Sequence, residues 1–188
     1  MKKHLSLVIA LVIMLCLTAC TGNKSKADGE TVDVKYYADL GQINGVDYKL
    51  GDSVETVKQK LEAAAQSASS EDEEGFFYDY QSGDYTVLTD GTVCCCYKTE
   101  RPEDGITHIV KYGEAYGFKQ GSVSIEVSDA MSKAGFSTKE RDAASGELFF
   151  LPSGAGSSYS VLQYDFNKNS VLFVFDENTL SAAVISAK

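Results

Sequence analysis

Three consecutive cysteines, Cys94, Cys95 and Cys96, are the residues whose type and spacing most suggest chemistry, because thiolates bind metals and carry redox reactions. On an extended strand, however, the middle side chain points to the opposite face from its two neighbours. The three thiols therefore cannot converge on one ion. We interpret them as small apolar residues packed in a sheet, and we predict no metal site.

Acid–base or nucleophilic catalysis would have few groups to use. The chain has two histidines, and His4 lies in the apolar leader described below, which leaves His108 for any Ser–His–Asp or Cys–His arrangement. The acidic run at residues 71–74 lacks the spacing of a calcium loop, and nothing marks two acids as a pair for glycoside hydrolysis. The glycine-rich residues 154–158 precede a predicted strand, so they present no helix N-terminus to a phosphate. We predict no enzyme and no cofactor.

Charge restricts the classes of partner. The chain of 188 residues has 17 basic and 27 acidic side chains and a net charge of −10. The electrostatic field of a protein with this net negative charge repels phosphate backbones and anionic membrane surfaces. We therefore predict no nucleic-acid binding.

The first 20 residues determine where the protein is expected to reside. Lys2 and Lys3 precede an apolar run at residues 5–17, and residues 17–20 then read Leu-Thr-Ala-Cys. The run is shorter than the roughly 20 residues of a spanning helix. The segment resembles a bacterial lipoprotein signal peptide with its lipobox, which implies removal of residues 1–19 and lipidation of Cys20. The resemblance implies a lipid anchor in the cell membrane and an extracytoplasmic location, at the cell surface or in the periplasm. Residues 20–30, which are small and polar, are expected to be a flexible tether.

The mature chain matches itself. Five segments of the first half align with five of the second: residues 48–51 with 118–121, 76–78 with 148–150, 85–88 with 159–162, 92–97 with 170–175, and 106–110 with 180–184. The spacing between matched segments changes only in stretches rich in glycine, serine or charge, where loops absorb insertions. The chain is therefore predicted to contain two units, residues 31–112 and 113–188.

Each unit is predicted to be one helix followed by four strands. In the first, Asp52 and Glu55 have capping-box spacing, and a helical stripe of apolar residues follows as far as Ser67. Aromatic and β-branched residues then predict strands at residues 76–80, 85–88, 92–97 and 106–111. In the second unit, residues 122–128 allow two interpretations. Their alternation of apolar and polar residues predicts a strand, followed by a helix at residues 128–135. The match to the first unit instead predicts that residues 122–128 are helical.

A family resemblance is carried by the opening of each unit. Residues 48–57, Tyr-Lys-Leu-Gly-Asp-Ser-Val-Glu-Thr-Val, resemble the start of the tandem helix-plus-sheet modules of secreted β-lactamase-inhibitory proteins and of related single-module assembly lipoproteins. Residues 118–122 with Val127 are a looser second instance. The resemblance implies an α+β fold of two helix-plus-four-stranded antiparallel units, with the helices on one face and a concave face that holds a protein. A tandem peptidase-propeptide-type module is a rival for the same pattern.

Tyrosines are the candidate recognition residues. Tyr78 and Tyr80 share one face of their strand, as do Phe173 and Phe175, and aromatic rings suit an exposed sheet surface that binds another protein. The leading hypothesis is a lipid-anchored, non-catalytic protein-binding module. The alternatives are an envelope assembly or scaffold lipoprotein and a carboxylate-dependent hydrolase.

Overall fold

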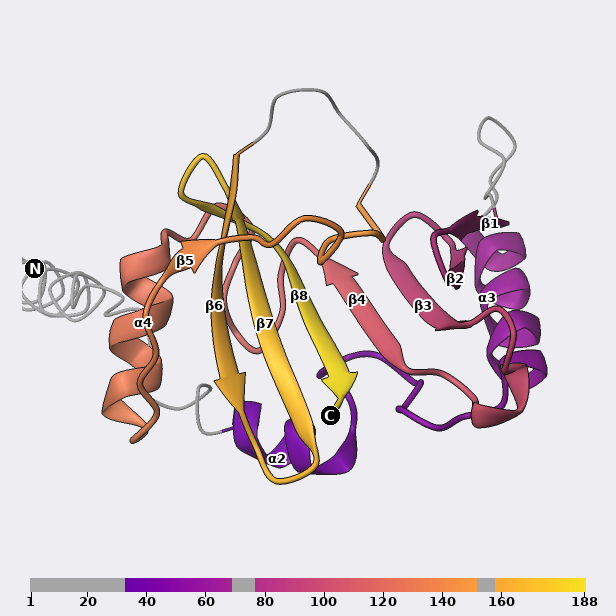
Figure 1. The fold of residues 1–188 in the computed structure, drawn as a ribbon, viewed down its shortest axis with the longest axis horizontal. Helices are drawn as coiled ribbons and strands as arrows, with labels where there is room; N and C mark the ends of the chain where they lie inside the picture. The colour runs from indigo at the N-terminus through magenta and orange to yellow at the C-terminus, as the bar shows by residue number, and fades with distance from the viewer. Residues whose placement is uncertain (1–32, 69–76, 152–157) are drawn as a thin grey trace, which may run out of the picture.

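The strands of the structure form one antiparallel sheet. A computed structural model describes residues 33–68, 77–151 and 158–188. Within these ranges the fold is α+β, with three α-helices and an eight-stranded sheet in the order β1-β2-β3-β4-β8-β7-β6-β5 (Figure 1). In chain order, the elements are α2 (Asp33–Leu40), α3 (Val54–Ala68), β1 (Tyr78–Ser82), β2 (Tyr85–Thr89), β3 (Val93–Lys98), the 3-10 helix η1 (Pro102–Asp104), β4 (His108–Tyr112), α4 (Ser124–Lys133), β5 (Arg141–Asp142), β6 (Tyr159–Asp165), β7 (Asn169–Asp176) and β8 (Thr179–Ala187).

Helix α3 confirms the helix predicted in the first half of the chain. Its N-terminus is capped by Ser53, whose Oγ accepts a hydrogen bond from the Thr56 N–H at 3.2 Å. Asp52, the predicted cap, instead accepts a bond from the Lys49 N–H in the preceding turn. The helix buries a stripe at helical spacing, which consists of Val57, Leu61 and Ala65.

Helix α4 shows that residues 122–128 are not a strand. The helix begins at Ser124, and before it Val123 makes only an isolated antiparallel bridge with Thr179. Val127 and Met131 are buried one turn apart, whereas Ile125 is 61% exposed. The alternation at residues 122–128 was misleading because Ile125 does not contribute to a buried face. The interpretation based on the repeat was therefore correct.

Helix α2 was not predicted. It buries Val34 and Ala38, which are one turn apart, and the Ala38 carbonyl accepts a hydrogen bond from Asn169 Nδ2 at 2.7 Å. This bond fastens α2 to the start of strand β7. No helix in the described ranges is both long and apolar enough to cross a membrane.

The first strand predicted for the second half of the chain is not the one that the structure forms. Residues 148–150, which match the start of the first strand in the repeat, form a turn, and the edge strand is β5 instead. Residues 143–151, named the strap here, pack against one face of the sheet through Phe150 and its apolar neighbours. Three consecutive large apolar residues, Leu148 to Phe150, lack the alternation that an edge strand with one wet face requires.

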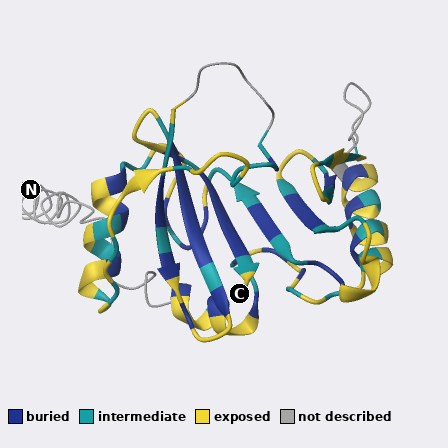
Figure 2. Cartoon of the chain, in the orientation of Figure 1, coloured by how far each residue is buried: buried dark blue, intermediate teal, exposed yellow. Residues whose placement is uncertain are grey.

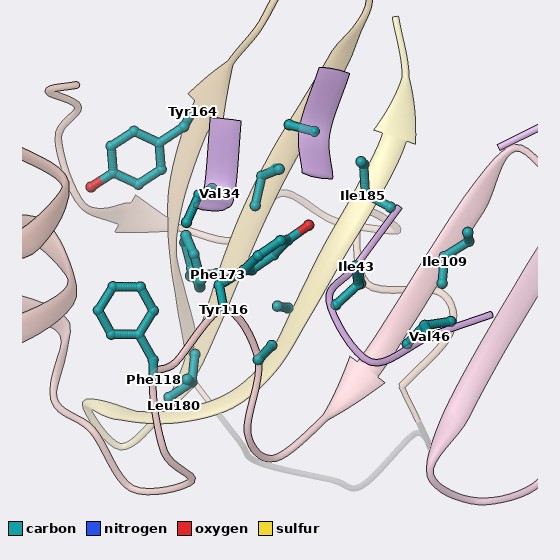
Figure 3. Packing of buried hydrophobic residues seen from close by; sticks show 14 of the residues in the cluster. Val34, Ile43, Val46, Ile109, Tyr116, Phe118, Tyr164, Phe173, Leu180 and Ile185 are labelled. Atoms are coloured by element: carbon teal, nitrogen blue, oxygen red, sulfur yellow. The ribbon is translucent and has the colours of Figure 1, made fainter. Parts of the chain in front are cut away.

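Each face of the sheet has its own apolar cluster. The larger cluster lies on the face named the core face and joins sheet residues to residues of α2, α3 and α4. Figure 3 shows part of it, including Val34 of α2 and Phe173 and Ile185 of the sheet. The smaller cluster lies on the other face, named the strap face, and contains Phe150 of the strap. Figure 2 shows the central strands as mostly buried. Sheet residues on the core face include Leu88, Cys95, Ile109, Phe173, Phe175 and Ile185. Those on the strap face include Val87, Cys94, Cys96, Val110, Val174 and Val184.

The turns that precede α3 and α4 adopt the same local structure. Gly51 and Gly121 have φ angles of 85° and 86°, a region that favours glycine. The Gly51 N–H donates to the Ile106 carbonyl at 2.8 Å, and the Gly121 N–H donates to the Leu180 carbonyl at 3.4 Å. The glycine N–H of each turn therefore fastens the turn to a backbone carbonyl at or next to a strand of the sheet, that of Ile106 before β4 or that of Leu180 in β8.

Candidate binding face and its pocket

The strap is held on the sheet by side-chain donors from two strands. The Tyr80 hydroxyl of β1 and the Tyr112 hydroxyl of β4 both donate to the Phe150 carbonyl, at 3.1 and 3.0 Å. Ser82 Oγ donates to the Phe149 carbonyl at 2.9 Å. The Phe150 ring is buried in the strap-face cluster. The strap therefore combines apolar burial with satisfied backbone carbonyls.

The shared acceptor makes the two tyrosines energetically coupled. We expect Tyr80→Phe and Tyr112→Phe each to lower the free energy of unfolding by about 1 kcal/mol. The double variant should lose more than the two single losses together, by roughly 1 kcal/mol, because it leaves the Phe150 carbonyl with neither donor. Urea unfolding of the four proteins measures this coupling.

A matched control for this cycle is Tyr97→Phe, since Tyr97 is half-buried against the core-face cluster. It is expected to show no coupling with Tyr112→Phe. Additive losses in the Tyr80 and Tyr112 cycle would mean that the two hydroxyls do not share the Phe150 carbonyl.

A pocket of about 330 Å³ lies between the strap and the strap face. Its aromatic wall is formed by Tyr85 and Phe149, whose rings stack with centroids 4.3 Å apart. The His108 ring contacts both edge-on, at 5.2 and 5.4 Å. The remaining lining residues are Gly146, Glu147, Phe150, Gln163, Ser170, Leu172, Val184 and Ser186.

His108 is a neutral, oriented imidazole in this wall. Burial, together with the nearby Lys98 cation, lowers its pKa to about 4. Thr107 Oγ1 donates its proton to the Cys96 carbonyl at 3.1 Å and lies 3.0 Å from His108 Nδ1. The neutral ring therefore has one N–H donor and one acceptor nitrogen.

Glu147 is an ionised carboxylate at the pocket. Its two oxygens accept hydrogen bonds from Arg141 Nη1 and Nη2 at 2.8 and 2.6 Å, and the Ala144 N–H donates at 2.7 Å. The hydrogen bonds from Arg141 are the main reason that the pKa of Glu147 is lowered. A carboxyl with a lowered pKa is a poor general acid at neutral pH.

The aromatic residues predicted for binding fall into two groups. Tyr78 is 46% exposed and stacks on the half-buried Tyr80, with ring centroids 5.8 Å apart. Phe173 and Phe175 lie on the core face with no exposed surface. Their assignment to an open binding surface is therefore corrected, because both rings pack inside the larger cluster.

The cysteines are packed as the alternation predicts. Cys95 lies on the core face, and Cys94 and Cys96 lie on the strap face. Burial raises the pKa of all three thiols, and Cys94 Sγ donates to the Tyr112 hydroxyl at 3.2 Å. Among the residues that the structure describes, no group of three His, Cys, Asp or Glu side chains is placed to hold a metal ion.

Some predicted features fall outside the described residues. These are the predicted signal peptide at residues 1–19, the lipidation site Cys20, the tether at residues 20–30, the acidic run at residues 71–74, residue 76 at the start of the first predicted strand, and residues 154–157 of the glycine-rich segment.

Sequence reasoning did not find the pocket. Its polar lining comes from residues far apart in the chain, among them His108, Glu147, Gln163 and Ser186. The one local sign of the strap was the apolar run at residues 148–151, which stands between segments of charged and small residues. That run could have indicated a segment packed on the sheet rather than a strand.

In comparisons with known proteins, no family model, no curated protein and no solved structure matches this chain.

Proposed function

We propose that this protein is a lipid-anchored, non-catalytic extracytoplasmic module that holds a protein partner on the strap face of its sheet. The anchor would be lipid on Cys20, followed by the tether at residues 20–30. The helices and strands of the described structure lie between Asp33 and Ala187, so residues 29–188 contain the whole described fold.

We further propose that the sheet consists of two tandem units, residues 31–112 and 113–188. Corresponding backbone hydrogen bonds support this. The Ile106 N–H donates to the Asp52 carbonyl at 2.9 Å, and the Leu180 N–H donates to the Ser122 carbonyl at 2.8 Å. In the sequence repeat, Ile106 matches Leu180. Two unrelated segments would have no reason to use matched positions for the same bonds.

The pairing of β4 with β8 also supports two units related by a pseudo-twofold axis. Val110 faces Val184 across the pair, and these two residues match each other in the repeat. The bonds just beyond the two ends of β4 are reciprocal, since the Gly113 N–H donates to Ser181 O at 2.9 Å and the Ala187 N–H donates to Thr107 O at 3.3 Å.

The proposed placement of all helices over the core face is supported by the larger cluster. It contains two fully buried residues from each of the three α-helices, together with sheet residues of one face only. Those helix residues are Val34 and Ala38, Val57 and Leu61, and Val127 and Met131. The strap face is then left for a partner wherever the strap does not cover it.

The observation that carries the binding proposal is the exposed ring of Tyr78 on edge strand β1. Tyr78 pairs with Thr89 and lies on the same face of the sheet as Tyr80. Tyrosine provides a large contact area at a small cost in side-chain entropy, and large exposed aromatic residues are typical of interfaces. The net charge of −10 favours a partner with a basic surface.

The experiment is capture of envelope proteins by soluble residues 29–188. We expect Tyr78→Ala to reduce capture of the specific partner at least about tenfold, the scale of an aromatic interface anchor. Tyr80 is left intact because it also fastens the strap.

Tyr36→Ala is the matched control for this capture experiment. Tyr36 is 61% exposed on α2, and its ring packs on Tyr37, which belongs to the larger cluster. Its removal is expected to leave capture unchanged. Equal losses from both variants, or capture of no specific protein by the parent chain, would contradict the proposal.

A further inference from the structure

The one charged residue in the lining of the pocket, Glu147, is already paired. Arg141 neutralises Glu147 through two hydrogen bonds. Lys188 Nζ lies 3.9 Å from Asp165 Oδ1, and the Ser170 hydroxyl donates to that same oxygen. A charged ligand would therefore lose its hydration without gaining an unpaired counterion among the lining residues. The pocket consequently favours a neutral ligand.

The polar lining groups require a ligand that can both donate and accept hydrogen bonds. The neutral His108 ring has one donor and one acceptor nitrogen, and Ser170, whose proton goes to Asp165, is left as an acceptor. Gln163 donates one amide N–H to Asp165, which leaves it a second N–H to give. The Ser186 hydroxyl can do either. Ligand hydroxyl groups satisfy all of these partners, because each one donates one hydrogen bond and accepts others.

The rest of the lining is apolar and aromatic. Leu172 and Val184 come from neighbouring strands, and Tyr85 and Phe149 form the wall. At about 330 Å³ the pocket is at the lower end of the range for small-molecule sites. The occupant must therefore be small and must combine an apolar surface with a polar rim.

A pyranose sugar has this combination, because its ring C–H groups form an apolar face and its hydroxyl groups form the rim. We propose that the pocket between the strap and the sheet binds one neutral sugar residue. This inference goes beyond the proposed protein-binding function and does not depend on it, since the pocket and the exposed Tyr78 ring are separate features.

The test is an amide NMR titration of residues 29–188 with four methyl glycosides, those of glucose, galactose, mannose and N-acetylglucosamine. At least one glycoside should shift the signals of Ser170, Ser186 and Gln163 in a saturable way. Ser186→Ala should weaken that binding about fivefold, the effect of losing one hydrogen bond. Ser132→Ala, on the exposed surface of α4, is the matched control and should leave the binding constant unchanged.

Two outcomes would overturn the proposal. One is that none of the four glycosides shifts these signals, although the spectrum shows a folded protein. The other is that n-butylammonium binds in the pocket and the glycosides do not, which would make it a site for cations. The capture experiment with Tyr78→Ala is unaffected by either result, so failure of this proposal is distinguishable from failure of the proposed function.

Discussion

Replacing Phe173 by alanine is expected to lower the free energy of unfolding by about 3–5 kcal/mol, the usual cost of removing a fully buried phenylalanine side chain. The ring has no exposed surface and meets three other rings edge-on, those of Tyr116, Phe118 and Tyr164, at 5.9, 5.4 and 6.1 Å (Figure 3). Tyr164 comes from β6, and Tyr116 and Phe118 come from the segment before α4. The variant therefore removes a side chain of β7 on which two other parts of the chain converge.

Urea unfolding followed by far-ultraviolet circular dichroism measures this loss. Phe149→Ala is the control, because Phe149 is only half-buried, whereas Phe173 is fully buried. Its loss is expected to be clearly smaller. Equal losses for the two variants would show that Phe173 is not at the centre of the larger cluster.

The four strands of the first half could be predicted because their signals are local. The turn at Asp90 and Gly91 shows why, since Asp90 Oδ1 accepts hydrogen bonds from the Thr92 and Val93 N–H groups, and Gly91 has a φ of 86°. The side chain and the backbone conformation that form this hairpin are encoded within four residues.

The faces of the strands could not be assigned in the same way. Strand β7 is buried on both sides, so its residues show no alternation from which a face could be chosen. Phe173 and Phe175 were therefore placed on an open surface, whereas they lie in the core. Which face of β7 meets the helices depends on packing between segments distant in the sequence.

The strap was missed for a related physical reason. Residues 148–150 are as apolar as a strand, and their match to residues 76–78 concerned composition alone. Their position on the sheet is set by the tyrosine hydroxyls of β1 and β4, which are 70 and 38 residues from Phe150. No local pattern carries that information, so the pocket that the strap encloses was not predictable either.

Lowering the pH from 7 to 4 is expected to destabilise the protein through His108 by about 3 kcal/mol. The folded protein holds the pKa of His108 at about 4, mainly through burial and secondarily through Lys98, whereas its ordinary value is 6.5. The difference corresponds to about 3 kcal/mol at 1.36 kcal/mol for each tenfold change in proton affinity. Above pH 6.5 the imidazole is neutral in both states, so the full stability is present.

As the pH falls below 6.5, the unfolded chain binds a proton that the folded protein does not, so stability decreases until the pH reaches about 4. Unfolding free energies between pH 7 and 4 measure this slope for the parent chain and for His108→Phe. The variant keeps a ring against Tyr85 and Phe149 but has no group to titrate. Glu147 and Asp165, whose pKa values are lowered, also lose stabilising charge at acidic pH, and they do so in both proteins. The difference between the two curves therefore isolates the imidazole, and parallel curves would show that His108 is not buried as a neutral group.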